Sequence, residues 1–370
     1  MKTHVFIVND YTFPSHLNYL FAGTGAKDKD EEISLLSDIK RVRPGDLVIF
    51  YIEATTRVKG GFYGIFKIAD QTPLVFQVPG QNGFLPNLGK KLIYRTLIEP
   101  YEVYSEGVTE WEALDKLPVY ATEIQWSLIY RKLKGRRGCT PLLPWEADRL
   151  INMIRNQNNG TPIASSNFIA CLDWDLTNRK IIVNQNRQNY PYQRYYNFDV
   201  VGRICDLINS RRAYEVYLQL YFTENIGVDQ NLNLIIGNNL IWFGNEVACG
   251  VGMQKIDILT ICQNGDRIEY RLIELKDESV QPEVINQIEY YVNWASQNCG
   301  RHLENAFNWN IQPVIVAPAH NPRNWPDIIN AFNMYNQRKL SLPILYFEFN
   351  VHCDSLERNI GFNPIDYNRY

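Results

Sequence analysis

The chain has 370 residues, of which 45% are hydrophobic and 21% are charged. These ordinary globular values exclude intrinsic disorder as a description of the whole chain, and the length suggests two or three domains of roughly 150 residues each. The formal net charge is −3, from 37 basic and 40 acidic side chains. A globally basic coat is therefore excluded, and any binding of DNA or RNA must use a local basic patch.

The sequence shows no membrane segment. No stretch approaches the roughly 18 consecutive apolar residues of a transmembrane helix, and the apolar run near the start is too short for a signal peptide. The seven cysteines form no CxxC pair. Neither a disulfide framework nor a zinc knuckle is expected, so we expect a protein of the reducing cytoplasm.

Residues 1–158 are predicted to form a strand-rich first domain. β-Branched and aromatic residues between Gly, Pro and Asp breaks indicate strands at 5–8, 46–52 and 61–68. Apolar residues at helical spacing predict a closing helix over 140–155. The polar, turn-rich stretch that follows favours a linker, so residues 159–196 are interpreted as a connector.

Residues 197–370 are predicted to form a second domain in which helices and strands alternate. Helices are expected near 210–222, from Pro282 onward and over 324–335, and strands near 240–243, 255–262, 267–275, 314–317 and 344–349. This mixture predicts an α/β core with a mixed sheet, and an α+β chain overall.

The pair Asn264-Gly265, between two apolar runs, predicts a β-hairpin. A two-residue loop there would place Asp257 opposite Leu272, and Asp257 and Glu274 would then be diagonal neighbours roughly 7 Å apart at Cα. Because residues two apart on a strand share a face, Lys276 would lie on that face as well.

Two carboxylates and an ammonium at this separation indicate phosphoryl chemistry. Carboxylate oxygens suit Mg²⁺, which polarises a phosphoryl group and helps make water nucleophilic, and a lysine can orient that water or offset developing charge. The alternative is a solvated hairpin with a cross-strand ion pair of little energetic value. Ile256, Ile258 and their apolar neighbours favour a buried hairpin, in which charges require partners or a metal.

The segments Lys255-Ile256-Asp257-Ile258-Leu259 and Ile273-Glu274-Leu275-Lys276 resemble the PD-(D/E)XK nuclease signature. Gln287 to Tyr291 resembles the QxxxY motif of the RecB-like branch, and Val314 to Pro318 resembles the strand that follows it in NucS-type endonucleases. The resemblance covers about 205 to 350. It implies a restriction-endonuclease-like mixed sheet flanked by helices.

The resemblance also implies roles for individual residues. Asp257 and Glu274 match the metal ligands, and Lys276 matches the catalytic lysine. Glu215 matches a further acid near the metal. Gln287 and Tyr291 match residues that support the site or touch the DNA backbone. Read from the residues alone, Asp277 and Glu278 are expected to be solvated. Glu246 is either an acid behind the site or a strand-edge charge.

The first domain resembles the PUA-like superfamily, closest to EVE and YTH domains, through the segments 6–11, 42–51 and 60–68. The resemblance implies a PUA-like β-barrel with helices that holds a modified base in an aromatic cage. The aromatic candidates for this cage are Tyr11, Phe21, Tyr63 and Trp126, and ordinary core packing is the alternative for each.

Basic residues are concentrated at two places. The first is a basic run, which is a candidate for DNA-phosphate binding, with a solvated face as the alternative. The second is Arg211 and Arg212, near the helix of Glu215, which could play a similar part. The run comprises Arg131, Lys132, Lys134, Arg136 and Arg137.

Together these features predict a modification-dependent restriction endonuclease that uses Mg²⁺, with Mn²⁺ as an alternative. Its partner would be base-modified double-stranded DNA, and one site per chain implies a homodimer for cutting both strands. A repair endonuclease of the NucS type and a catalytically inactive nucleic-acid-binding protein are the alternatives. The aromatic stretch 190–196 is a candidate interface.

Overall fold

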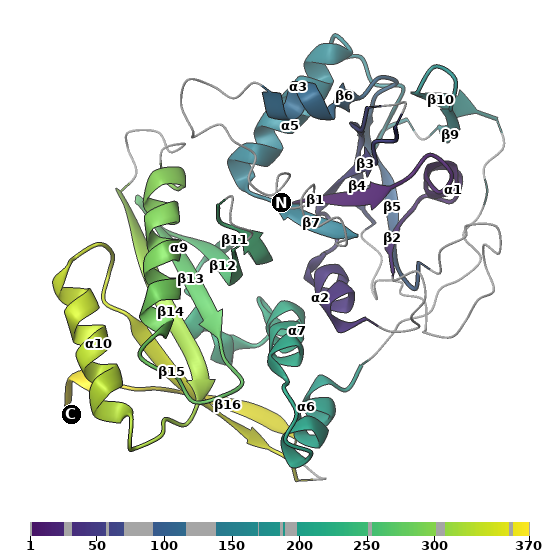
Figure 1. Cartoon of the computed structure of the whole chain (residues 1–370). Coiled ribbons are helices and arrows are strands. Elements are labelled where there is room, and N and C mark those ends of the chain that lie inside the picture. The colour runs from purple at the N-terminus through teal and green to yellow at the C-terminus, as the bar shows by residue number, and fades with distance from the viewer. Residues whose placement is uncertain are drawn as a thin grey trace. The chain divides into compact units, whose positions relative to one another are not determined.

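A computed structural model describes residues 2–25, 32–56, 59–69, 92–115, 138–168, 170–185, 188, 198–250, 254–300, 308–354 and 358–369. The chain divides into two compact units, Met1–Asn197 and Phe198–Tyr370. Both units combine helices with sheets (Figure 1), which confirms the predicted mixed α/β class, α+β overall. Among the residues described, no helix combines the length and apolar character needed to cross a membrane.

The first unit is built on an eight-stranded sheet whose main path runs β2-β5-β4-β3-β1-β7. β1 and β3 are parallel, and the other pairs are antiparallel. Its elements are β1 (Thr3–Val8), α1 (Phe13–Tyr19), β2 (Phe21–Thr24), α2 (Ile33–Arg41), β3 (Leu47–Ile52), β4 (Gly61–Ile68), β5 (Tyr94–Val103), β6 (Val108–Thr109), α3 (Glu110–Asp115), β7 (Cys139–Leu142), α5 (Pro144–Gln157), β8 (Ala164–Ser165), β9 (Cys171–Asp175) and β10 (Lys180–Asn184).

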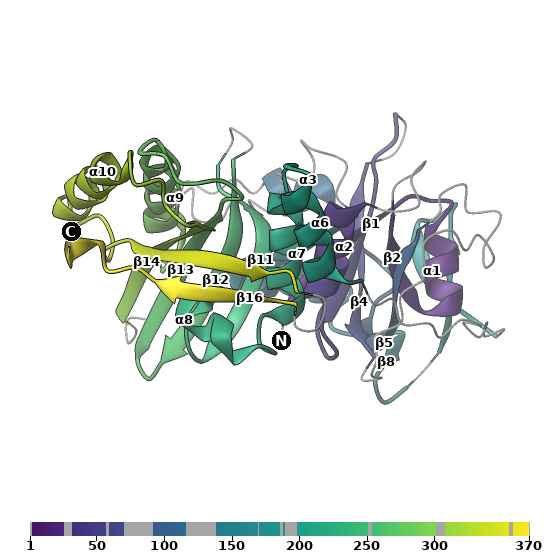
Figure 2. The same cartoon turned by 90° about the horizontal axis from the view of Figure 1, so that it is seen from below.

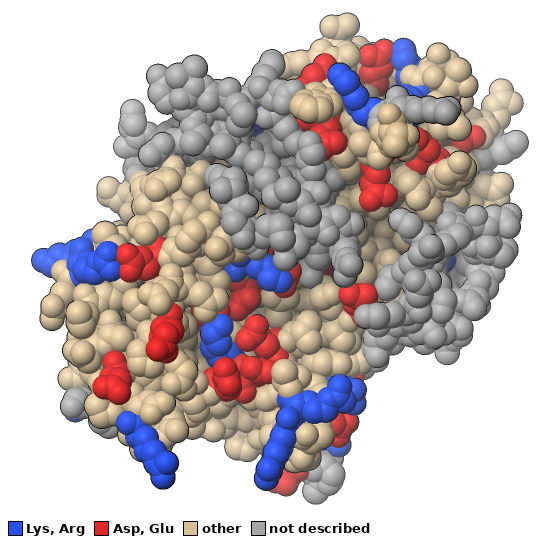
Figure 3. All heavy atoms as spheres, in the orientation of Figure 1, with Lys and Arg blue, Asp and Glu red and all other residues tan. Residues whose placement is uncertain are grey.

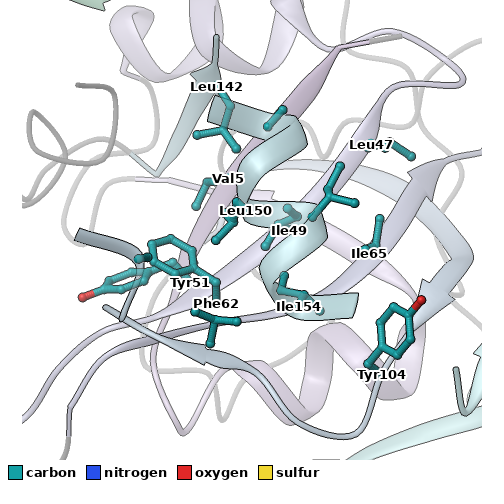
Figure 4. Close-up of a cluster of buried hydrophobic side chains, with 14 residues drawn as sticks. Val5, Leu47, Ile49, Tyr51, Phe62, Ile65, Tyr104, Leu142, Leu150 and Ile154 are labelled. Carbon is teal, nitrogen blue, oxygen red and sulfur yellow. The ribbon is translucent and has the colours of Figure 1, made fainter. Parts of the chain in front are cut away.

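The closing helix α5 covers the core of this sheet. Leu150 and Ile154 point from α5 toward Val5, Ile49 and Ile65 (Figure 4), and all five side chains are buried. Burial of such side chains contributes about 1.5–3 kcal/mol each, which makes this cluster a main source of the unit's stability.

The described part of the expected connector belongs to the first unit. β8 pairs with β5, and β9 and β10 form a separate two-stranded sheet. Trp174 of β9 packs against Phe13 of α1, with ring centroids 5.1 Å apart. Polar turn residues suggest a linker, but tertiary contacts of a few apolar residues tie this segment to the sheet.

The second unit contains a six-stranded mixed sheet of order β11-β12-β13-β14-β15-β16. The pairs β13–β14 and β14–β15 are parallel, and the rest are antiparallel. Its elements are α6 (Val200–Asn209), α7 (Glu215–Asn225), η3 (Gln230–Leu232), α8 (Asn233–Ile236), β11 (Leu240–Ala248), β12 (Lys255–Asn264), β13 (Arg267–Leu275), α9 (Val284–Asn298), β14 (Asn308–Pro318), α10 (Trp325–Gln337), β15 (Leu345–His352), β16 (Asn359–Pro364) and η4 (Tyr367–Arg369).

Helices cover both faces of this sheet, with α9 and α10 on one face and α8 on the other (Figure 2). Trp325 of α10 contacts Tyr346 of β15, whereas Phe349, three residues further along the strand, contacts Tyr214 just before α7. Since alternate residues of a strand face opposite sides, α7 packs on the face away from α10.

The structure contains a disulfide between Cys205 of α6 and Cys353 after β15, and the other five cysteines are free. The sequence predicted no disulfide framework, and it did not predict this single bridge. The two residues are 148 positions apart in the sequence, and only the packing of α6 near the end of β15 brings them together.

Candidate active site

The hairpin of β12 and β13 has a different register from the predicted one. Asn264 pairs with Arg267, so the loop is Gly265-Asp266 and not Asn264-Gly265. Of these loop residues only Gly265 has a positive φ, 65°, the arrangement typical of a type II′ turn. The register moves by two residues, which keeps every side chain on its predicted face. If this register is extended one residue beyond the last pair, Ile258 with Ile273, Asp257 lies directly opposite Glu274.

Asp257 lies where the ladder between the two strands ends. The last pair is Ile258 with Ile273, and Asp257 Oδ2 accepts a hydrogen bond from the backbone N of Leu275 at 2.9 Å. Burial of the carboxyl group, and then the nearby Glu274 carboxylate, raise the pKa of Asp257 well above its usual range. A carboxyl group in this state gains free energy when a cation arrives beside it.

Glu274 is 1% exposed and is held from two sides. Its Oε1 accepts a hydrogen bond from Lys276 Nζ, and its Oε2 lies 3.0 Å from the hydroxyl of Tyr291. Although burial lowers it, the Glu274 carboxylate raises the pKa of Lys276 overall, so this lysine stays cationic. Burial, followed by Glu274, raises the pKa of Tyr291, which stays a proton donor.

Helix α9 supplies the rear wall of the site. Tyr291 also lies 2.8 Å from the carbonyl oxygen of Lys255, and Gln287 Nε2 lies 3.5 Å from the Tyr291 hydroxyl. Trp294, about one turn further along the same helix, is buried and 5% exposed. The helical spacing therefore places Gln287 and Tyr291 at the pocket, where Tyr291 contacts Glu274, whereas Trp294 packs in the core.

All six residues predicted for the nuclease site line one pocket of about 440 Å³ within the second unit. Lys and Arg side chains gather beside Asp and Glu side chains on the face between α7 and α9 (Figure 3). Sequence reasoning had not placed Gln254, Lys255, Asn286 or Tyr290 there. The pocket-lining residues are Glu215, Gln254, Lys255, Asp257, Glu274, Lys276, Asn286, Gln287, Tyr290 and Tyr291.

Two acids beside the pocket have defined partners. Glu246, which has a positive φ of 48°, forms an ion pair with Lys255. Asp277, expected to be solvated, instead accepts hydrogen bonds from the backbone N atoms of Tyr214 and Glu215, at 2.6 and 3.2 Å. Burial raises the pKa of Glu215 itself, the first residue of α7.

The donor set fits a hard divalent cation that keeps most of its ligands outside the protein. Within the described ranges, no three His, Cys, Asp or Glu side chains come close enough together to hold a metal ion by themselves. Asp257 and Glu274 offer carboxylate oxygens only. Mg²⁺ is commonly bound by one or two carboxylates, with water and phosphate completing its octahedron.

The aromatic candidates of the first unit differ in accessibility. Tyr11 is 88% exposed, on the turn before α1. Phe21 is fully buried against His16, and Tyr63 is 7% exposed with its ring 4.9 Å from that of Trp174. Among these three, Tyr11 offers an open ring face to a base.

Some of the residues predicted to contact DNA are described by the structure, and others are not. Arg211 and Arg212 lie in the turn between α6 and α7 and are exposed. Trp126 and the basic run 131–137 lie outside the described residues, as does the aromatic stretch 190–196.

Comparison with known proteins yields no family assignment. No family model matches the chain, and no curated protein matches it significantly. Among solved structures, a hypothetical protein from Leishmania major aligns over 42% of this chain and 96% of its own, with 11% identity and a TM-score of 0.30. Human THYN1, in complex with DNA containing 5-methylcytosine, aligns over 41% and 97%, with 10% identity and a TM-score of 0.27. TM-scores this low carry no inference about function.

Proposed function

We propose that the second unit hydrolyses phosphodiester bonds of DNA and that the first unit directs it to a modified base, as in a modification-dependent restriction endonuclease. The observation that carries the proposal is the convergence of Asp257, Glu274 and Lys276 on one pocket. A pocket lined by titratable groups with perturbed pKa values is a typical mark of a functional site. The motifs that resemble PD-(D/E)XK nucleases supply the reaction class.

The residues of the pocket have distinct tasks in this reaction. Asp257 and Glu274 would hold Mg²⁺ or Mn²⁺, which when bound supplies positive charge to the scissile phosphate and acidifies water. Lys276, fixed by Glu274, donates hydrogen bonds to the attacking water or to the developing negative charge. Tyr291 orients the Glu274 carboxylate through its hydroxyl. Glu215 takes part as a further acid at the pocket wall.

Recognition of DNA is assigned to exposed aromatic and basic residues. The open ring of Tyr11 can stack on an extruded base, which contributes about 1–3 kcal/mol. Arg211, Arg212 and the basic run 131–137 are assigned to phosphates. Because the described part of each chain forms one pocket with this set of residues, we assign the cutting of both antiparallel strands to a two-fold homodimer.

Cleavage assays on matched duplexes test the function. The full-length protein with Mg²⁺ is expected to cut methylated or hydroxymethylated duplexes and to leave the unmodified duplex intact. Cutting of mismatched DNA alone would favour a NucS-type repair enzyme. Binding without any cutting would indicate an inactive nucleic-acid-binding protein.

Salt dependence tests the basic run. Removing one lysine or arginine that binds a phosphate should lower the slope of log K against log salt by about 0.9. Substituting Arg131, Lys134 and Arg137 by Gln in the full-length protein is expected to reduce the slope accordingly. An unchanged slope would identify the run as a solvated face.

A further inference from the structure

Helix α7 has no capping side chain of its own. Its N-cap residue, Tyr214, makes no side-chain cap hydrogen bond. The first N–H groups of a helix lack partners within the helix and need acceptors from elsewhere. Here Asp277 Oδ2 accepts from the N–H groups of Tyr214 and Glu215, at 2.6 and 3.2 Å. The cap of α7 is thus supplied by a residue 63 positions away, just beyond β13.

This carboxylate joins two of the segments that supply charged groups to the pocket, α7 and the end of β13. Asp277 directly follows Lys276, and Glu215 is the first residue of α7. A second polar contact between α7 and the sheet, from Gln219 Nε2 to the carbonyl oxygen of Asp257, lies one turn further along and is longer, at 3.4 Å. The short tie at Asp277 therefore fixes the end of α7 at which Glu215 lies.

We propose that Asp277 is a positioning residue: its carboxylate holds the N-terminus of α7 where Glu215 reaches the pocket of Glu274 and Lys276. The inference rests on the proposed nuclease function of this pocket. Aspartate suits the task because its side chain is short and because a negative charge is favoured at a helix N-terminus. Hydrogen bonds to an ionised acceptor are also stronger than neutral ones.

The obvious alternative is a cap that contributes to stability alone. Such a cap would leave the turnover of folded enzyme unchanged when it is removed. A positioning residue instead lowers kcat, since a displacement of about 1 Å at a reacting group can cost roughly 100-fold in rate. It leaves KM for DNA little changed, because the DNA contacts assigned above do not involve it.

Three variants separate these roles in the full-length protein. Asp277→Ala is expected to lower kcat by about 10-fold to 100-fold at an unchanged KM. Asp277→Asn, which keeps an acceptor oxygen, is expected to recover most of that loss. Glu278→Ala removes an exposed carboxylate one residue further along and serves as the matched control, with wild-type kcat expected.

A double-mutant cycle tests whether Asp277 acts through Glu215. In a Glu215→Ala background, Asp277→Ala is expected to cost no further activity, and a fully additive loss would overturn the inference. Wild-type kcat in Asp277→Ala would overturn it as well. If Asp277→Ala does not fold, a loss of more than 10-fold in the kcat of Asp277→Asn would overturn the inference. If the parent enzyme cuts no duplex, the proposed function falls with it, whereas a failed cycle in an active enzyme affects Asp277 alone.

Discussion

Each unit contains an aspartate whose pKa is shifted, but the two have different surroundings. In the first unit, Asp46 accepts hydrogen bonds from His4 Nε2 at 2.9 Å, from Arg43 N at 3.1 Å and from Lys2 N at 3.1 Å. Although burial raises it, the hydrogen bond from His4 helps to lower the pKa of Asp46 overall. In the second unit, Asp257 accepts a hydrogen bond from Leu275 N, and burial of its carboxyl group, followed by the nearby Glu274 carboxylate, raises its pKa.

This difference separates a structural acid from a candidate catalytic one. The charge of Asp46 is already satisfied by protein donors inside a closed core, so it stabilises the fold. The negative charge of Asp257 is stabilised poorly by its own surroundings and lies at an open pocket, so an added cation can stabilise it. Opposite pKa shifts for the same residue type therefore predict opposite responses to mutation and pH.

The largest effect is expected from the carboxylate pair. Glu274→Gln keeps the shape of the side chain but removes its charge, so cleavage with Mg²⁺ should fall by roughly 10³-fold, about 4 kcal/mol in the barrier. DNA binding should persist, because the assigned DNA contacts lie elsewhere. Single-turnover cleavage and filter binding measure the two quantities.

A matched control lies on the same strand. Glu269 pairs with Arg271 and does not line the pocket, so Glu269→Gln should cleave at nearly the parental rate. If Glu269→Gln lost as much cleavage activity as Glu274→Gln, the negative charges on β13 would matter for the fold and not for catalysis.

The second effect concerns acid sensitivity of the first unit. Burial lowers the pKa of both His4 and His16 to about 4, against 6.5 for an ordinary histidine. The unfolded chain takes up these protons first, so the stabilisation is complete above pH 6.5 and is lost as the pH falls toward 4. Between about pH 7 and pH 5 each histidine should cost roughly 2 kcal/mol of unfolding free energy.

Hydrogen exchange in β1 and α1 at the two pH values measures this loss within the first unit. His16→Gln removes one of the two titrating groups and should therefore halve the pH dependence. A first unit equally stable at both pH values would contradict the neutral, buried state of these histidines.

The sequence predicted the shared face of the carboxylates better than their register. Type I′ and type II′ loops have the same length, so Asp257 and Glu274 stay on one face whichever loop forms. The register depends on which residue takes the positive φ, and Asn264-Gly265 is compatible with two answers. The spacing of Gln287 and Tyr291 survived because helical periodicity is a local property.

Contacts between distant segments lay beyond sequence reasoning. The disulfide of Cys205 with Cys353 and the cap from Asp277 to α7 join residues 148 and 63 positions apart. Tyr11 and Phe21 are equivalent aromatic candidates in the sequence, yet one is 88% exposed and the other fully buried. Their difference is set by the packing of α1 and β2, which no local pattern reveals.

The smallest effect tests the comparison most directly, through one substitution made in both units. Asp46→Asn removes the charge that His4 and Lys2 stabilise and should lower the free energy of unfolding by about 2 kcal/mol. Asp257→Asn removes a carboxyl group whose pKa is raised. Ionising that group costs more free energy in the folded state than in the unfolded chain. In EDTA at neutral pH the substitution should therefore raise stability by roughly 1 kcal/mol.

The pH dependence of the parent protein carries the same signs. For Asp46 the stabilisation is present above the unfolded pKa and is lost as the pH falls through the lowered one. For Asp257 it is present at low pH and is lost as the pH rises through the raised one. Urea unfolding followed by hydrogen exchange in β3 and in β12 reports on each unit separately. If Asp257→Asn lost as much stability as Asp46→Asn, Asp257 would be a structural acid, and the pocket would lose its strongest argument for binding a cation.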